Sequence, residues 1–398
     1  MGKSIAINAG SSTLKFKLYE MPSEEVITSG AIDRIGLGDS DVTIKYGDGE
    51  KFSETMNIQN HEEAIQLLLD KLLSLKIIND YSEITGVGHR VVAGGEYFTD
   101  SVVIDDEVLA KIEDLVEFAP LHEPANIMGI KAFKKILPDV ISVAVFDTSF
   151  HTTLPETNYM YSLPYEYYEK YRARKYGAHG TSYRYVSARA AAMLDKPIED
   201  LKMIIMHLGA GASLDAIKGG KSFDTSMGFT PVTGITMATR SGDVDPSVLQ
   251  YIMQKEDISD FDDVIDILNH KSGLLGISGV SADMRDIEKK AGEGGDHRSQ
   301  LAHDIFINRV VRYVGSYIAE MGGVDAIVFT AGIGENDKGI RAELAEKLAC
   351  FGVKIDDAKN DIRGEERDLS SDDATVKTLL IPTDEEVMIV RDIERLRK

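Results

Sequence analysis

The spacing of apolar residues along the chain predicts helices that alternate with strands. Apolar residues recur at helical spacing in segments 61–76, 106–119, 124–137, 181–194, 301–321, 339–349 and 384–398. Short apolar runs typical of buried strands stand at 140–147 and 324–330. Thr181 is the predicted N-cap of its helix, and Gly322 with Gly323 is expected to end the longest one. This alternation favours an α/β fold built in layers.

A strand–turn–strand pattern occurs twice, far apart in the sequence. Residues 5–19 read IAINAGSSTLKFKLY, and residues 202–221 read KMIIMHLGAGASLDAIKGGK. Each has an apolar strand, a polar residue, a turn containing glycine and serine, and a second strand. The two are either unrelated hairpins or copies of one unit, and a duplication predicts two related domains facing each other.

Three glycine-containing turns follow apolar strands and could hold an anion. Small residues let backbone amides approach a phosphate group closely. The third turn, FTAGIGEN at 329–336, places Gly332 and Gly334 before a predicted helix. Each turn alone is equally consistent with an ordinary chain reversal. Together, the three turns indicate a nucleotide site.

The standard nucleotide-binding signatures are not met. GGKS at 219–222 ends like a P-loop, but Asp215 stands where the first glycine is required. GAGAS at 209–213 lacks the third glycine of the dinucleotide fingerprint. The set of motifs that marks protein kinases is also missing.

Composition places the chain among globular proteins of the cytoplasm. Its 398 residues suggest two domains, with 43% hydrophobic and 28% charged residues. No apolar run approaches the roughly 20 residues of a membrane helix, and no signal peptide is expected. The single cysteine, Cys350, fits a reducing compartment and is expected to be packed rather than reactive.

Net charge excludes some partners and constrains how an anion could bind. The formal charge is −22, without a basic stretch, so we expect neither nucleic acid nor an anionic membrane as partner. An anionic ligand must therefore be held by local donors, such as backbone amides, helix N-termini, a few arginines and a metal ion.

Several polar residues lie in glycine-flanked loops or directly after strands, where a periodic core would not place them. These residues are Arg90, His122, Asp147, His179, Arg240 and Glu385. Arginine, histidine and carboxylates around a phosphate cradle are the groups that phosphoryl transfer requires. The structural alternatives are surface salt bridges for the two arginines and a helix N-cap for Asp147.

The histidines do not suggest a metal site. None of the nine has the spacing of a zinc motif. His89 and His151 are interpreted as core or turn residues.

The loops together carry a resemblance to one family. INAGSSTLKF, GHRVVAGGE, FDTSFH, YGAHGTS, SMGFTPVTG, TRSGDVDP, TAGIGEN and IPTDEE occur in the order and spacing of the acetate kinase family. The resemblance spans essentially the whole chain. It implies an α/β fold of two duplicated actin-like (ribonuclease H-like) domains with a nucleotide cleft between them. The expected domains are 1–150 plus 385–398, closed by the C-terminal helix, and 151–384, carrying most of the nucleotide site.

The resemblance also implies a reaction, its cofactors and an assembly. The reaction is reversible in-line transfer of the ATP γ-phosphoryl group to acetate, a small carboxylate, giving acetyl phosphate and ADP. It uses Mg²⁺, or Mn²⁺ in its place, and the family forms homodimers.

The site residues are carried over motif by motif. The catalytic residues implied by the resemblance are Arg90, Asp147, His179 and Arg240, with His122 beside them. Substrate-binding residues are Arg90, Val92, Leu121 and Pro231, and the metal ligands are Asn8 and Glu385. Nucleotide-binding residues are Lys15, His207, Leu208, Gly209, Ala210, Gly211, Asp283, Met284, Arg285, Gly332, Ile333, Gly334, Glu335 and Asn336.

Three positions depart from the family pattern. Ala210 stands where asparagine is common, Ala178 where phenylalanine is common, and Ala93 where histidine is common. The change at Ala178 predicts a larger apolar pocket that accepts propionate beside acetate. The alternatives are therefore a propionate or butyrate kinase of the same superfamily, or a noncatalytic actin-like or chaperone-like nucleotide switch.

Overall fold

The computed structural model describes residues 2–120 and 122–397, which divide into two compact units. Unit 1 comprises Met1–Phe150 with Asp384–Lys398, and unit 2 comprises His151–Thr383. Asp384, expected in the second domain, groups with unit 1 because its side chain caps the C-terminal helix at Val387 N. It also accepts hydrogen bonds from Lys17 and Tyr19.

Unit 1 is built on a mixed sheet of eight strands in the order β5-β4-β3-β2-β1-β6-β8-β7. Its antiparallel half contains β1 (Gly2–Gly10), β2 (Thr13–Met21), β3 (Glu25–Asp33), β4 (Ser40–Tyr46) and β5 (Glu50–Met56). The other half contains β6 (Ile84–Val91), β7 (Val102–Val103) and β8 (Ile141–Phe146), with β1, β6 and β8 mutually parallel.

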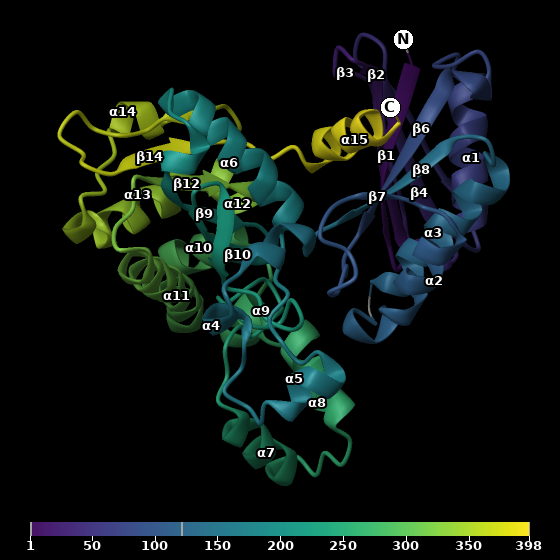
Figure 1. The fold of residues 1–398 in the computed structure, drawn as a ribbon. Helices are drawn as coiled ribbons and strands as arrows, with labels where there is room; N and C mark the ends of the chain where they lie inside the picture. Colours follow the sequence, from purple (N-terminus) through teal and green to yellow (C-terminus); the bar gives the residue numbers. More distant parts are fainter. Residues whose placement is uncertain (1, 121, 398) are drawn as a thin grey trace. The chain divides into compact units, whose positions relative to one another are not determined.

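Helices cover both faces of this sheet (Figure 1). The C-terminal helix α15 (Glu385–Leu396) lies against β1, β6 and β8. The approach is close because a Cβ on Gly86 or Gly88 of β6 would lie 2.2 Å from an isoleucine of α15. On the other face, α1 (His61–Ser74), α2 (Asp106–Asp114) and α3 (Glu123–Ile136) bury their apolar sides.

Unit 2 repeats the central part of this topology. Its six-stranded sheet has the order β11-β10-β9-β12-β14-β13. The strands are β9 (Lys202–Leu208), β10 (Ala212–Lys218), β11 (Lys221–Thr225), β12 (Ala326–Thr330), β13 (Arg367–Asp368) and β14 (Lys377–Leu380). An antiparallel triple β9-β10-β11 continues into parallel β9-β12-β14, as β1-β2-β3 continues into β1-β6-β8. The predicted duplication and α/β class are thus confirmed.

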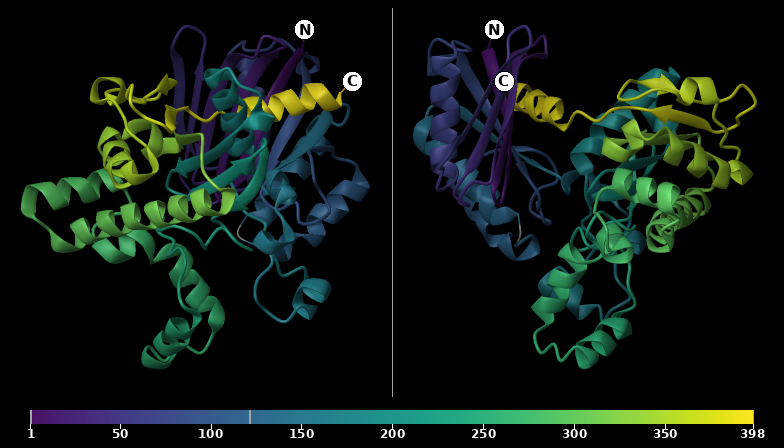
Figure 2. Two further views of the ribbon diagram at one scale, coloured as in Figure 1. Left: turned by 60° about the vertical axis from the view of Figure 1, so that its left-hand side comes forward. Right: turned by 180° about the vertical axis from the view of Figure 1, so that it is seen from behind.

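The helices of unit 2 pack around this sheet. On the sheet lie α6 (Gly180–Leu194), which contacts β9 and β12, and α11 (His297–Met321), which contacts β9 and β10. α9 (Gly273–Ser278) and α10 (Met284–Gly294) precede α11 in the chain, and α12 (Ala331–Asn336), α13 (Lys338–Lys347) and α14 (Asp357–Asn360) follow it. α4 (Glu156–Tyr159) contacts β11 at the end of the sheet. Away from the sheet lie α5 (Glu166–Tyr171), α7 (Pro246–Lys255) and α8 (Phe261–His270), and both views of Figure 2 show α7 and α8, in green, at the tip of a projecting segment.

Three local predictions were wrong. The helix predicted over 106–119 ends at Asp114, and a 3₁₀ turn, Val116–Phe118, keeps the same apolar side chains packed. His179, not Thr181, occupies the N-cap position of α6, so the helix starts two residues earlier than that cap implies. Cys350 is exposed rather than packed.

The other segments agree with their predicted type. The helix predicted over 301–321 starts earlier, at His297, and Gly322 ends it with φ 69°. No helix in the described ranges combines the length and apolar character needed to cross a bilayer.

Candidate functional site

Four predicted site residues meet on one face of the unit 1 sheet. Side chains alternate along a strand, so Asn8 of β1 and Arg90 of β6 lie on the face that α15 covers. The Arg90 guanidinium is ion paired with Asp147, which directly follows β8. Its Nη1 lies 3.4 Å from Asn8 Oδ1, and its Nε lies 3.8 Å from a Glu385 carboxylate oxygen at the start of α15.

The charges in this cluster are unbalanced, because two carboxylates surround one guanidinium. Burial lowers the pKa of Arg90, but Asp147 and Glu385 outweigh it and raise that pKa above its ordinary value. For Glu385, burial raises the pKa to about 7; Arg90 opposes this shift and the Asp147 carboxylate adds to it. The Asp147 side chain is only 1% exposed. The Arg90 side chain is 21% exposed, so this ion pair lies largely below the surface.

The oxygen donors in this cluster fit a magnesium ion. Mg²⁺ prefers oxygen ligands and is usually held by one or two carboxylates plus substrate phosphates and water. Asn8 and Glu385 supply an amide and a carboxylate oxygen beside the same guanidinium. Within residues 2–120 and 122–397, no group of three or more His, Cys, Asp or Glu is placed to hold a metal. The remaining ligands of such an ion would come from phosphate oxygens and water.

Two further residues of unit 1 support the segment after Arg90. Glu123 is fully buried at the start of α3 and accepts a hydrogen bond from Ala93 N at 2.6 Å. Asn126, one turn later, accepts from Val92 N at 3.3 Å and donates to Ala9 O at 2.8 Å. These contacts hold the backbone at Val92, a predicted substrate-binding residue.

Lys15 and His122 are two further predicted site residues of unit 1. Lys15 is exposed on β2 and stands directly opposite Asn8 in the β1–β2 ladder. His122 occupies the N-cap position of α3 without a side-chain capping bond. Leu121 lies outside the described residues.

In unit 2, the predicted catalytic residues gather at the turn between β9 and β10. The ring of His179 stacks on that of His207, with centroids 4.0 Å apart and planes inclined by 13°. A Cβ placed on Gly211 would lie 3.5 Å from His179 Nε2 and 3.6 Å from Arg240 Nη1. Arg240 Nη1 also donates to Pro231 O at 3.3 Å. The glycine therefore leaves room for a ligand beside two cationic or donor side chains.

A cavity of about 800 Å³ in unit 2 brings together most of the predicted nucleotide residues. Its lining includes Gly209, Ala210, Asp283, Met284, Arg285, Gly332, Ile333 and Asn336. Asp283 caps α10 and pairs with the exposed Arg285. A volume of this size is within the range of small-molecule sites.

Gly334 and Glu335, which were predicted to bind nucleotide, make contacts within the protein. The Gly334 carbonyl accepts a hydrogen bond from the buried Arg341. Glu335 accepts from the backbone amides of Ala331 and Thr383 at 2.8 and 3.1 Å. Neither is among the described residues that line the cavity. Leu208, also predicted, is a fully buried strand residue.

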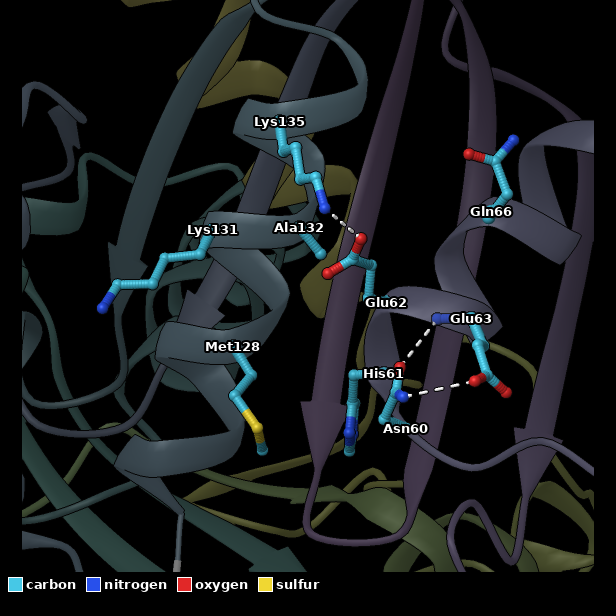
Figure 3. A pocket seen from close by; sticks show the side chains of 9 residues that line it. All are labelled: Asn60, His61, Glu62, Glu63, Gln66, Met128, Lys131, Ala132 and Lys135. Atoms are coloured by element: carbon cyan, nitrogen blue, oxygen red, sulfur yellow. Dashed lines mark hydrogen bonds and ion pairs between the residues drawn. The ribbon is translucent and has the colours of Figure 1, made fainter.

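Another cavity, of about 630 Å³, lies between α1 and α3 and contains none of the predicted residues (Figure 3). Its charged rim is paired, with Lys135 Nζ 2.5 Å from Glu62. At its base, His61 Nε2 donates to Gly10 O at 2.7 Å and so supports the β1–β2 turn. The His61 hydrogen bond therefore stabilises the β1–β2 hairpin, and the residues that line this groove are not among the predicted site residues.

Sequence reasoning missed two residues that hydrogen-bond to the predicted site residues or to the backbone next to them. In APLHEP it selected His122, whereas the neighbouring Glu123 is the fully buried one. A glutamate on the apolar side of a helix was the available signal. It also missed Ser213, which contacts His179 from β10 and reads like an ordinary strand residue.

The predicted core histidines are confirmed as such. His89 is buried, and burial lowers its pKa to about 3. His151 is also buried and contacts Ser222 at 2.8 Å.

The sequence of the chain is similar over its whole length to those of known proteins. The acetokinase family model matches residues 3–391. The acetate kinase of Fructilactobacillus sanfranciscensis is 67% identical over 396 residues, covering 100% of this chain and 99% of the relative. That of Enterococcus faecalis is 63% identical over 398 residues, covering all of both chains.

Solved structures give the same result. The crystal structure of Porphyromonas gingivalis acetate kinase matches with a TM-score of 0.95 and 43% identity, covering 100% of both chains. A propionate kinase from Francisella tularensis matches with a TM-score of 0.92 and 40% identity, covering 98% of this chain and 99% of its own. The resemblance seen in the sequence is confirmed: the chain belongs to the acetokinase family, phosphotransferases that use a carboxyl group as acceptor.

Proposed function

We propose that the chain transfers the γ-phosphoryl group of ATP to acetate through the residues described above. The observation that carries this proposal is the Arg90 guanidinium. It is held among Asn8, Asp147 and Glu385 at the carboxyl ends of the parallel strands β1, β6 and β8. A partly buried guanidinium that is held in place is suited to pairing with a small carboxylate in a fixed orientation. Val92 follows it and supplies an apolar wall for the methyl group.

The chemistry needs positioning more than activation. An acetate oxygen attacks the γ-phosphorus while the bond from that phosphorus to the β,γ-bridging oxygen breaks, giving acetyl phosphate and ADP. A carboxylate is already an anionic nucleophile, so no base has to remove a proton. The main obstacle is the repulsion between two anions, which Arg90 and Arg240 reduce.

In unit 2, the β9–β10 turn is the proposed phosphate grip. Backbone amides of Gly209–Gly211 can approach an anion because these residues carry little or no side chain. His179 and Arg240 flank Gly211 and are placed to stabilise charge that develops on the transferred group. The cavity bounded by Asp283–Arg285 and Gly332 is the proposed adenosine site.

Magnesium completes the proposed charge balance. When bound, it would neutralise phosphate oxygens, with Asn8 and Glu385 as its protein ligands. The excess of negative charge around Glu385 supports a cation at this place.

A second substrate is favoured by one feature of unit 2. Ala178 is buried and stands where the family commonly has phenylalanine. One extra methylene changes binding in an apolar pocket by only about 1–3 kcal/mol, so propionate is a proposed additional substrate. Its kcat/KM relative to acetate and butyrate tests this, and a strict acetate preference would refute it.

We also propose that the two compact units are the two predicted domains, that the chain acts in the cytoplasm and that it forms a homodimer. Exposed apolar residues on the projecting segment of unit 2, including Tyr251 at 60% and Phe261 at 53%, support self-association. The single cysteine supports the cytoplasmic location.

The direct test incubates the protein with ATP, MgCl₂ and a panel of carboxylic acids, and traps acyl phosphate with hydroxylamine. We expect acetohydroxamate that depends on both ATP and acetate. Failure to form any acyl hydroxamate, with ATP still bound, would contradict the proposed reaction.

A further inference from the structure

The buried hydroxyl of Ser213, close to the β9–β10 turn, takes part in several hydrogen bonds. Ser213 lies on β10, is fully buried, and contacts three polar atoms. Its Oγ is 2.8 Å from Ala178 O, 2.9 Å from His179 Nδ1 and 2.5 Å from the Tyr183 hydroxyl. All three distances are those of hydrogen bonds.

A count of protons assigns the direction of each bond. A serine hydroxyl has one proton to donate and two lone pairs that accept. The Ala178 carbonyl can only accept a hydrogen bond. If all three contacts are hydrogen bonds, Ser213 must therefore donate its one proton to Ala178 O. The Tyr183 hydroxyl and His179 Nδ1 must then both donate to Ser213 Oγ. His179 therefore carries a proton on Nδ1.

The other ring nitrogen of His179 faces the proposed phosphate grip. Nε2, not Nδ1, is the atom beside the Cβ position of Gly211, and Arg240 Nη1 is equally near that position. The described contacts include His207, stacked on the His179 ring, Arg240, whose Nη1 lies near the same Gly211 position as Nε2, and Tyr183, which reaches His179 through Ser213. With Nδ1 already protonated, neutral His179 presents a lone pair at Nε2, and only the imidazolium presents an N–H there.

We propose that Ser213 is a positioning residue that fixes the His179 tautomer, so that His179 donates a hydrogen bond to the transferred phosphoryl group only as the imidazolium. This rests on the role given to His179 under the proposed function. The tautomer itself follows from Ser213 alone.

The first test uses the wild-type protein and does not depend on activity. ¹⁵N-histidine labelling, with His179→Gln to assign the signals, reports which ring nitrogen carries the proton at high pH. We expect neutral His179 to be protonated at Nδ1, opposite to the tautomer that a solvated neutral histidine favours. A His179 signal protonated at Nε2 would overturn the proposal, even in a fully active enzyme.

The second test compares two serine variants. Ser213→Ala removes the acceptor of the Nδ1 proton, whereas Ser182→Ala removes a matched hydroxyl that contacts His207 Nδ1 at 2.9 Å. For wild type, kcat is expected to fall as rising pH deprotonates His179. Ser213→Ala should lose this alkaline decline, because neutral His179 can then carry its proton on Nε2. Ser182→Ala should keep it.

The outcomes separate the two levels of inference. If both serine variants keep the alkaline decline, Ser213 does not control the proton on His179 and the inference fails. If His179→Gln turns over normally while wild-type Nδ1 is protonated, the catalytic role of His179 fails and the structural assignment of Ser213 stands.

Discussion

At the scale of single residues, the site depends on charged groups that are held before any ligand arrives. Arg90 is fixed by Asp147 and Asn8, and Arg240 by the Pro231 carbonyl. Preorganised donors of this kind need little rearrangement during the reaction, which makes each of them valuable to catalysis.

Arg240→Ala should therefore lower kcat by about 10²–10³, the typical cost of losing one donor to the transition state. ATP should still bind, because Arg240 is not among the described residues that line the proposed adenosine cavity. Steady-state kinetics and calorimetric titration with ATP measure the two effects. Arg189→Ala, which removes a surface pair with Glu366, is the matched control. Turnover within a few-fold of wild type would refute the assigned role.

Glu123 gives a prediction about stability and pH. Burial raises its pKa from 4.5 to about 7, and the Asp147 carboxylate adds to the shift. Between these two values the folded chain binds more protons than the unfolded chain, so the free energy of unfolding falls as pH rises. The total loss from this group is about 3 kcal/mol.

Glu123→Gln should remove this loss, because glutamine stays neutral and its carbonyl can still accept from Ala93 N. The variant should match wild type near pH 5 and be more stable at pH 8, as measured by urea unfolding at both values. Glu107→Gln, on the exposed side of α2, should show no such difference. An equal stability of Glu123→Gln and wild type at pH 8 would count against a buried, titrating Glu123.

At the scale of elements, the sequence predicted what depends on local periodicity. The segments 61–76 and 124–137 formed helices because one apolar face of each is buried in the core, and 140–147 formed a strand whose last four residues are all buried. The cap at Thr181 was wrong because His179, placed by contacts with Ser213 and His207, starts the helix earlier. Contacts between distant segments decide such details.

The site residues divide in the same way. Arg90 and Arg240 were found from sequence because polar groups beside glycines have no role in a core, although Arg90 lies within β6 and not in a loop. Glu123 and Ser213 were missed, since each looks ordinary within its helix or strand and acquires its partners only through tertiary packing.

The β9–β10 turn gives a prediction for an element. A Cβ on Gly211 would make only ordinary contacts with His179 and Arg240, and its backbone is not left-handed. Gly211→Ala should therefore fold normally, with an unchanged Tm without ligand. The methyl group should occupy space needed by phosphate and weaken ATP binding about tenfold or more.

Calorimetric titration with ATP measures this effect, and differential scanning calorimetry measures the Tm. Gly292→Ala, where a Cβ would meet open space, is the control. Wild-type ATP affinity in Gly211→Ala would argue against a phosphate grip at this turn.

At the scale of the whole molecule, the six strands of the unit 2 sheet follow the same order as six strands of the unit 1 sheet, and each unit carries its own group of predicted site residues. Unit 1 supplies Asn8, Arg90, Asp147 and Glu385, and unit 2 supplies His179, Arg240 and the nucleotide cavity. The predicted site residues are thus divided between two copies of one topology.

The exposed apolar residues of α7 and α8 give a prediction about the assembly of the whole molecule. Light scattering coupled to size-exclusion chromatography should give twice the chain mass of 43.7 kDa. The double substitution Tyr251→Glu and Phe261→Glu should shift the protein toward the monomer, because charge disfavours an apolar interface. A wild-type monomer at micromolar concentration would contradict the proposed homodimer.

The most direct measurement is a crystal structure with a non-hydrolysable ATP analogue and acetate. The adenosine is expected in the cavity lined by Asp283 and Gly332, the phosphates at Gly209–Gly211, and the acetate carboxylate on Arg90. A nucleotide bound elsewhere, or an acetate that makes no contact with Arg90, would contradict the proposed phosphoryl transfer.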